Sequence, residues 1–132
     1  MKDFKFSEAI KAVEAFHNCF NIKNSFKPIA QLEDGQAQLR YDLMKEETEE
    51  YLEAVKNNDI VEIADALGDQ LYILCGTILK HGMQDKIVEV FEEIHRSNMS
   101  KLGADGKPIY REDGKVLKGK NYFRPNIKNI IE

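Results

Sequence analysis

Apolar residues recur every three or four positions in several stretches of this chain, the spacing that gives an α-helix one apolar face. The first stretch predicts a helix over residues 7–20 that is capped by Ser7, with apolar positions Ile10, Val13, Phe16 and Phe20. Residues 21–34 contain Asn, Pro and Asp, which predict a loop. A second helix is predicted from about Gln36 to Lys56.

A third helix is predicted from the break at Asn57 and Asn58 to His81, with Asp59 as its cap and Gly82 following its end. Its main apolar stripe steps by four and three residues in turn, through Ile60, Ala64, Leu67, Leu71, Leu74 and Ile78. Further apolar residues lie on the other side. We therefore expect this helix to be covered from more than one direction, which in so short a chain favours a homo-oligomer.

The pattern changes after the fourth predicted helix, which covers residues 86–98 with Asp85 as its cap. Two glycine-containing turns, at 104–106 and 112–114, predict a small β-hairpin that is followed by an extended tail. The pattern as a whole predicts an all-α fold: a four-helix bundle over residues 7–99 with a short hairpin tail over 100–132. A length of 132 residues indicates a single domain over 1–132.

The charge of the chain is divided unevenly between these two parts. Residues 101–128 hold eight Lys and Arg against three Asp and Glu, a charge of +5, whereas the remainder holds eleven against twenty, a charge of −9. An acidic body would repel a nucleic-acid duplex, so we expect no nucleic-acid partner. An acidic body with a basic tail suits a substrate that combines a metal with phosphate.

The location of the protein is indicated by two absences. Cys19 and Cys75 form no C-x-x-C motif, which favours a reducing compartment. The longest apolar run without charge, residues 70–79, is too short to span a bilayer. We expect a soluble, cytoplasmic protein without a membrane partner.

Carboxylates on two successive predicted helices are the strongest chemical signal in the sequence. A rotation of 100° per residue places Glu47 and Glu50 on the same arc as Leu39, Leu43 and Ala54. On the next helix Glu62, Asp65 and Asp69 lie on one face, and no Lys or Arg occurs between Asn57 and Leu79. Buried carboxylates are costly unless a cation neutralises them, and an all-oxygen set suits Mg²⁺, Mn²⁺ or Ca²⁺. The alternative is a solvated acidic face, which we accept for Glu49 and Glu53.

The tail offers groups that would bind a nucleotide. Basic side chains can contact phosphate and an aromatic ring can stack on a base. The residues concerned are Asn98, Lys101, Lys118, Lys120, Tyr122 and Arg124. The alternative for each of them is a lysine-rich tail that only keeps the protein in solution.

The acidic motifs resemble those of the all-α nucleoside triphosphate pyrophosphohydrolases, which include the MazG-like enzymes and the phosphoribosyl-ATP pyrophosphohydrolases. That superfamily carries E-E-x-x-E on one helix and E-x-x-D on the next, and the chain has Glu46, Glu47 and Glu50 followed by Asp69. The resemblance covers about residues 36–98. Ala66 occupies the position of the family's second-motif glutamate, so Asp65 or Glu62 would have to replace it.

The resemblance implies a Mg²⁺-dependent hydrolysis of a nucleoside triphosphate, ribo or deoxy, to the monophosphate and pyrophosphate, by a homodimer or homotetramer. Glu47, Glu50 and Asp69, with Asp65 or Glu62, would hold Mg²⁺ or Mn²⁺. Glu46 or a metal-bound hydroxide would supply the nucleophile. Lys101, Lys118 and Lys120 would contact phosphates, and Asn98 or Tyr122 the sugar or base. The alternative is a non-catalytic helical module that senses nucleotides or binds a partner, which Ala66 favours.

Overall fold

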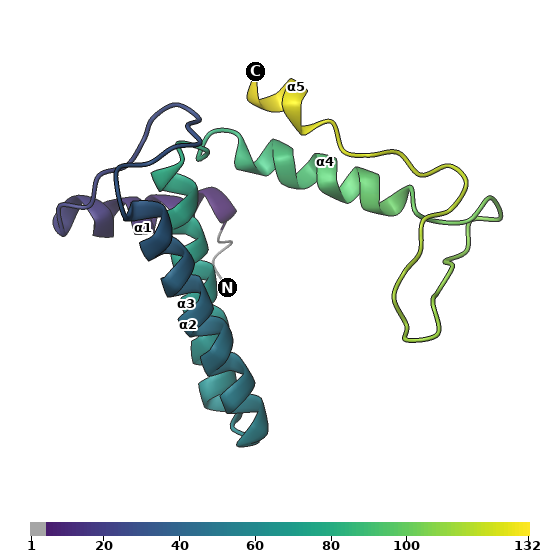
Figure 1. The fold of residues 1–132 in the computed structure, drawn as a ribbon, viewed down its shortest axis with the longest axis horizontal. Helices are drawn as coiled ribbons and strands as arrows, with labels where there is room; N and C mark the ends of the chain where they lie inside the picture. Colours follow the sequence, from purple (N-terminus) through teal and green to yellow (C-terminus); the bar gives the residue numbers. More distant parts are fainter. Residues whose placement is uncertain (1–4) are drawn as a thin grey trace. The chain divides into compact units, whose positions relative to one another are not determined.

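The structure, a computed structural model, describes residues 5–132 and shows only helices and irregular segments there. Figure 1 shows the helices in chain order: α1 Phe6–Cys19, α2 Gln36–Lys56, α3 Ile60–Lys80, α4 Ile87–Met99 and α5 Ile127–Ile131. The predicted all-α class is confirmed. The chain divides into two compact units, Met1–Asp85 and Lys86–Glu132, which we describe separately. The single domain over 1–132 stays a prediction.

The helix ends test the predicted caps. The carboxylate of Asp59 accepts hydrogen bonds from the backbone N–H groups of Val61 and Glu62, so the predicted cap of α3 is confirmed. Gly82 follows the end of α3 with φ +67°, a conformation that glycine adopts without strain. Two caps were predicted wrongly. Ser7 lies inside α1, which begins one residue earlier, and α4 is preceded by Lys86 rather than by Asp85 as its cap.

The first unit is built on α2 and α3, which run side by side in opposite directions after a turn of three residues (Figure 1). α1 packs against α3, where the rings of Phe16 and Tyr72 meet edge to face with centroids 5.7 Å apart. Small and apolar side chains fill the interior of this unit: Ile10, Val13, Ala54, Ala66, Cys75, Ile78 and Leu79. The free thiol of Cys75 is therefore a packing group.

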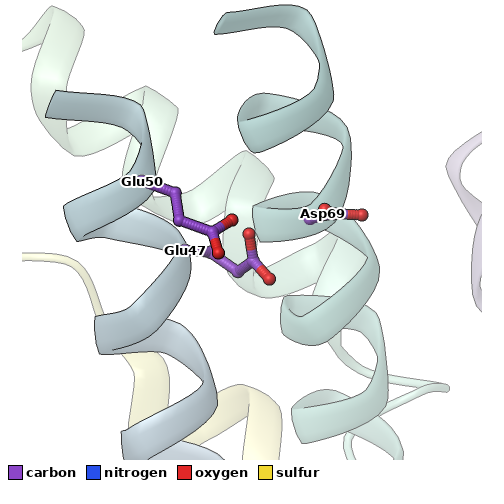
Figure 2. A group of neighbouring side chains, drawn as sticks. All are labelled: Glu47, Glu50 and Asp69. Carbon is purple, nitrogen blue, oxygen red and sulfur yellow. The ribbon is translucent and has the colours of Figure 1, made fainter. Parts of the chain in front are cut away.

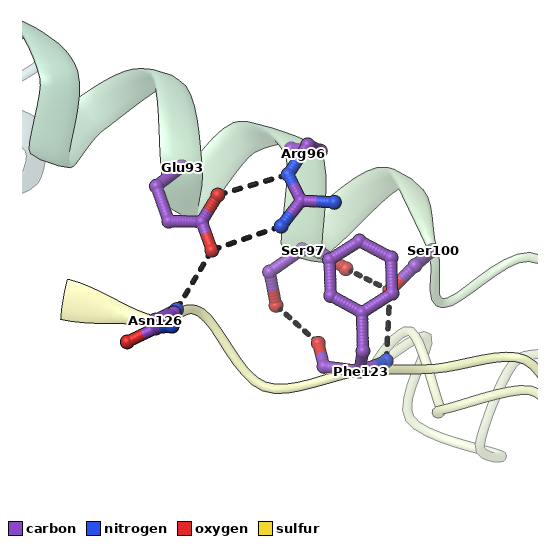
Figure 3. A network of polar contacts seen from close by, with 6 residues as sticks. All are labelled: Glu93, Arg96, Ser97, Ser100, Phe123 and Asn126. Carbon is purple, nitrogen blue, oxygen red and sulfur yellow. Dashed lines mark hydrogen bonds and ion pairs between the residues drawn. The ribbon is translucent and has the colours of Figure 1, made fainter. Parts of the chain in front are cut away.

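The second unit consists of α4, the segment after it and α5. Figure 3 shows that residues 123–126 lie along α4: the Ser97 hydroxyl donates to the Phe123 carbonyl over 2.8 Å, and the Asn126 backbone N–H donates to Glu93 over 2.7 Å. The Arg96 guanidinium lies 4.3 Å from the centroid of the Phe123 ring. This part of the chain is therefore packed against α4.

The hairpin stays a prediction. Residues 100–126 contain a single antiparallel bridge, between Tyr110 and Val116, at the position where the hairpin was expected. α5 was missed, because a helix of five residues gives no periodic signal; Asn126 caps it by accepting from the backbone N–H of Asn129. None of the helices in the described part of the chain is long and apolar enough to cross a membrane.

Candidate metal and nucleotide site

Three carboxylates converge between α2 and α3. Glu47 and Glu50 come from successive turns of α2 and Asp69 comes from the facing turn of α3, and one oxygen of each lies within 4.8 Å of the others (Figure 2). The i, i+3 spacing on α2 places the two glutamates above one another on the face toward α3. We call Glu47, Glu50 and Asp69 the carboxylate cluster.

The carboxylate cluster is electrostatically uncompensated. Burial, a hydrogen bond with Glu50 and the negative charges of Glu50, Asp69 and Glu46 raise the pKa of Glu47 to about 7. Burial and the charges of Asp65 and Glu50 likewise raise the pKa of Asp69. Among residues 5–132, no cationic side chain forms an ion pair with any member of the cluster. Residues 5–132 therefore do not neutralise the negative charge that they gather here.

One oxygen atom shows that the cluster suits a divalent cation. Glu47 Oε2 is buried and receives no hydrogen bond from the described part of the chain. A buried carboxylate oxygen without a donor is costly, and a cation bound to it would remove that cost. Three carboxylates that offer only oxygen atoms are the donor set of Mg²⁺ and Mn²⁺.

The remaining predicted ligands lie beside the cluster. Glu62 and Asp65 are exposed and line a hollow of about 450 Å³ together with Glu50, Glu53, Ala54 and Asn57. Ala66 is buried, with 2% of its surface exposed. The structure thus brings together three of the five predicted ligands and places the other two at the adjoining hollow. Glu46, the other predicted catalytic residue, is exposed on α2 next to Glu47.

The predicted nucleotide-binding residues all belong to the second unit. The backbone N–H of Gly119 donates to the carbonyl of Lys101 over 2.8 Å, which brings Lys101 next to the segment that carries Lys118 and Lys120. The Lys118 ammonium lies 4.8 Å from the centroid of the Tyr122 ring. Asn98 is exposed on α4, and its carbonyl accepts from the backbone N–H of Lys101 over 3.1 Å, so it adjoins this basic group.

Sequence reasoning missed a second group of ionisable side chains in the first unit, made of His17, Arg40 and Lys80, which we call the basic cluster. Each of these residues is at least nine-tenths buried. Arg40 donates from Nε to the Thr77 hydroxyl over 3.1 Å and from Nη2 to the Ile73 carbonyl over 2.9 Å. Lys80 Nζ donates to the Lys23 carbonyl over 2.7 Å. The available signal was the seven-residue spacing from Arg40 to Glu47, which puts both on one face of α2.

The third member of the basic cluster carries no charge. Nδ1 of His17 lies 2.5 Å from Asn24 Oδ1. Burial and the charges of Arg40 and Lys80 lower the pKa of His17 although the bond to Asn24 opposes them. The neutral ring therefore donates from Nδ1 to the amide oxygen.

Both acidic motifs lie within the part of the chain that matches a known protein family. The family model described as phosphoribosyl-ATP pyrophosphohydrolase matches residues 13–98, which include both helices of the carboxylate cluster. The chain belongs to the phosphoribosyl-ATP pyrophosphohydrolase family. The resemblance seen in the sequence is confirmed. Ala66 is therefore a departure from the second acidic motif of this family.

Two individual proteins are similar to this family member. A protein of Acanthamoeba polyphaga mimivirus, named only as uncharacterized protein L479, is 51% identical over 92 residues, which are 70% of this chain and 33% of the viral protein. This chain thus spans about a third of that relative's length. A solved structure from Exiguobacterium sp. 255-15, titled a "putative NTP pyrophosphohydrolase", aligns over 98% of this chain and 95% of its own with a TM-score of 0.50. At 22% identity that likeness shows a shared fold.

Proposed function

We propose that this protein hydrolyses a nucleoside triphosphate to the monophosphate and pyrophosphate with Mg²⁺ held by Glu47, Glu50 and Asp69. The observation that carries the proposal is the convergence of these carboxylates from two helices, with one buried oxygen left without a donor. Family membership supports a pyrophosphohydrolase activity in general. The choice of Mg²⁺ as the ion and of a nucleoside triphosphate as the substrate goes beyond what family membership supports, and both are part of the proposal.

The proposed reaction assigns distinct tasks to the acidic residues. Water attacks the α-phosphorus, the bond from that phosphorus to the bridging oxygen breaks, and pyrophosphate leaves. Bound Mg²⁺ would supply positive charge to the phosphate oxygens. Glu46, exposed beside the cluster, is the side chain proposed to accept the proton of the attacking water. Asp65 or Glu62, both at the adjoining hollow, would replace the carboxylate that Ala66 does not provide.

The basic side chains of the second unit are proposed to bind the substrate. Lys101, Lys118 and Lys120 would contact phosphate, and Asn98 or Tyr122 the sugar or base. Their support is the grouping of the lysines around Gly119 and the contact of Lys118 with Tyr122. Lys118→Ala with Lys120→Ala should raise KM by about tenfold while leaving kcat nearly unchanged. An unchanged KM would assign these lysines to solubility alone.

A homodimer or homotetramer is proposed as the working form. Leu67, Leu71 and Leu74 on the apolar stripe of α3 are each about half exposed on the single chain. Light scattering after size exclusion would measure the mass directly.

The competing function is a helical module that binds a nucleotide or a partner without turning it over. The absence of a carboxylate at Ala66 favours it. Pyrophosphate release, coupled to inorganic pyrophosphatase and measured over the common ribo- and deoxynucleoside triphosphates with Mg²⁺, separates the two functions. Turnover of at least one nucleotide by the wild type, abolished in Glu47→Gln, supports the enzyme. Glu49→Gln is the matched control, because Glu49 is exposed on the same helix outside the cluster.

A further inference from the structure

The alignment of α2 along α3 is set by a buried contact two helical turns away from the carboxylate cluster. Arg40 comes seven residues before Glu47, and Gly76 comes seven residues after Asp69. In an antiparallel helix pair these equal offsets put the Arg40–Gly76 crossing about 10 Å along the axis from the Glu47–Asp69 crossing. Any sliding or rotation at the first crossing is therefore transmitted to the second.

Arg40 is held tightly enough to define that alignment. Arg40 is 93% buried, and its guanidinium donates to two acceptors on α3, the Thr77 hydroxyl and the Ile73 carbonyl. Ile73 is one turn beyond Asp69, so the arginine is bonded to the backbone of the turn that follows a cluster carboxylate. A planar guanidinium with two fixed acceptors allows one orientation, which a lysine or an apolar side chain would not define.

The Arg40 guanidinium packs directly against Gly76. A Cβ atom at Gly76 would lie 2.5 Å from Arg40 Nη2 and 3.0 Å from His17 Nε2, so no larger residue fits without moving the guanidinium. Gly68, on the same helix, offers a contrast, because a Cβ there would meet nothing within 4 Å. The three atoms nearest to a Cβ at Gly76 all belong to Arg40 and His17 of the basic cluster.

We infer that Arg40, seated on Gly76 and beside His17, is a positioning residue that sets the alignment of α2 on α3 and thereby the spacing of Glu47 and Glu50 from Asp69. The inference rests on the proposed metal site. The only other hydrogen bond between the side chains of α2 and α3 in the described chain runs from Gln70 to Thr48, and it is exposed to water. An exposed bond between neutral groups constrains the helices far less than the buried guanidinium does.

The test compares Mn²⁺ affinity, measured by electron paramagnetic resonance of free Mn²⁺, in wild type, Arg40→Met, Gly76→Ala and the control Gly68→Ala. Circular dichroism well below the melting temperature establishes that each variant is folded. We expect Arg40→Met and Gly76→Ala to weaken Mn²⁺ binding by roughly 10- to 100-fold, the range seen when residues that orient metal ligands are changed. Gly68→Ala should stay within about twofold.

Gly76→Ala keeps the result interpretable if Arg40→Met fails to fold, since alanine favours a helix more than glycine does and the variant retains every charged group. Because both changes act on one contact, the double variant should bind Mn²⁺ no more weakly than Arg40→Met alone. Wild-type affinity in either folded variant overturns the inference. A wild type that neither binds Mn²⁺ nor releases pyrophosphate contradicts the proposed function instead.

Discussion

Two groups of ionisable side chains in the first unit, the buried basic cluster and the partly exposed carboxylate cluster, differ in whether their polar atoms have partners among the described residues. In the basic cluster each side chain has an acceptor within the protein: Arg40 has Thr77 and Ile73, Lys80 has the Lys23 carbonyl, and His17 has Asn24. In the carboxylate cluster Glu47 Oε2 has no donor among residues 5–132, and burial followed by the charges of neighbouring carboxylates raises the pKa of Glu47 and of Asp69.

The difference separates structure from function by a physical criterion. A buried charge that the protein itself satisfies contributes to a defined fold, whereas a buried charge that it leaves unsatisfied costs stability and is retained for what it binds. The two clusters should therefore respond in opposite ways when their members are removed. Measurements of activity, of stability and of its pH dependence each test this difference between the two clusters.

The largest effect is expected on turnover. Asp69→Asn and Glu47→Gln should each lower kcat by roughly 10²–10³-fold, because each removes a charge that would hold the cation which stabilises the transition state. Steady-state pyrophosphate release at saturating Mg²⁺ measures this. Glu49→Gln, exposed on the same helix, is the control and should keep wild-type activity. Full activity in Asp69→Asn would remove the carboxylate cluster from the mechanism.

A smaller effect on turnover should decide which acid replaces the carboxylate that is missing at Ala66. Asp65 is the nearer in electrostatic terms, since its charge raises the pKa of Asp69. We expect Asp65→Asn to lower kcat by about tenfold or more and Glu62→Gln to lower it less. The same assay on both variants gives the answer, and a loss confined to Glu62→Gln would reverse the assignment.

Removal of a single group should change stability with opposite signs in the two clusters. Thr77→Val deprives the buried Arg40 Nε of its acceptor and should lower the free energy of unfolding by about 1–3 kcal/mol. Glu50→Gln relieves the repulsion with Glu47 and should raise it by roughly 0.2–0.5 kcal/mol in EDTA. Urea unfolding of both variants without metal measures the two changes. A destabilised Glu50→Gln in EDTA would mean that the carboxylate is satisfied after all.

The smallest effect expected is on pH dependence. The folded metal-free protein keeps the Glu47 proton up to a pKa of about 7, above the ordinary 4.5, so the stability from this group is complete below pH 4.5 and is lost as pH rises through 7. His17 acts the other way: its lowered pKa means that stability is lost as pH falls below the ordinary 6.5. Glu47→Gln and His17→Gln should therefore change how the melting temperature in EDTA varies with pH. The two changes should be in opposite directions and amount to a few degrees at most.

The sequence was sufficient to predict the helices and the convergence of three carboxylates from α2 and α3. Apolar spacing predicted four helices whose ends lie within one or two residues of those observed, because amphipathic helices of more than ten residues carry a strong periodic signal. The arc shared by Glu47, Glu50 and Ala54 placed both glutamates on the apolar side of the helix, and Asp69 was identified as their partner from the family motif.

The parts that could not be predicted depend on contacts between distant residues. Ser7 has the right chemistry for a cap, but α1 begins one residue before it and has no side-chain cap hydrogen bond, and helix ends vary by a residue or two. Arg40 is indistinguishable in sequence from a solvated arginine, since its acceptors Ile73 and Thr77 come more than thirty residues later. The packing of residues 123–126 along α4 was missed for the same reason.

The most direct test of the contrast between the two clusters is a Mn²⁺ titration of wild type, Glu47→Gln and Glu49→Gln, followed by electron paramagnetic resonance of the free ion. If Glu47 is left unsatisfied because it binds a cation, wild type and Glu49→Gln should bind at least one Mn²⁺ per chain with equal affinity, and Glu47→Gln should bind it at least about tenfold more weakly. Equal Mn²⁺ affinity in Glu47→Gln and wild type would contradict the assignment of this cluster as the metal site.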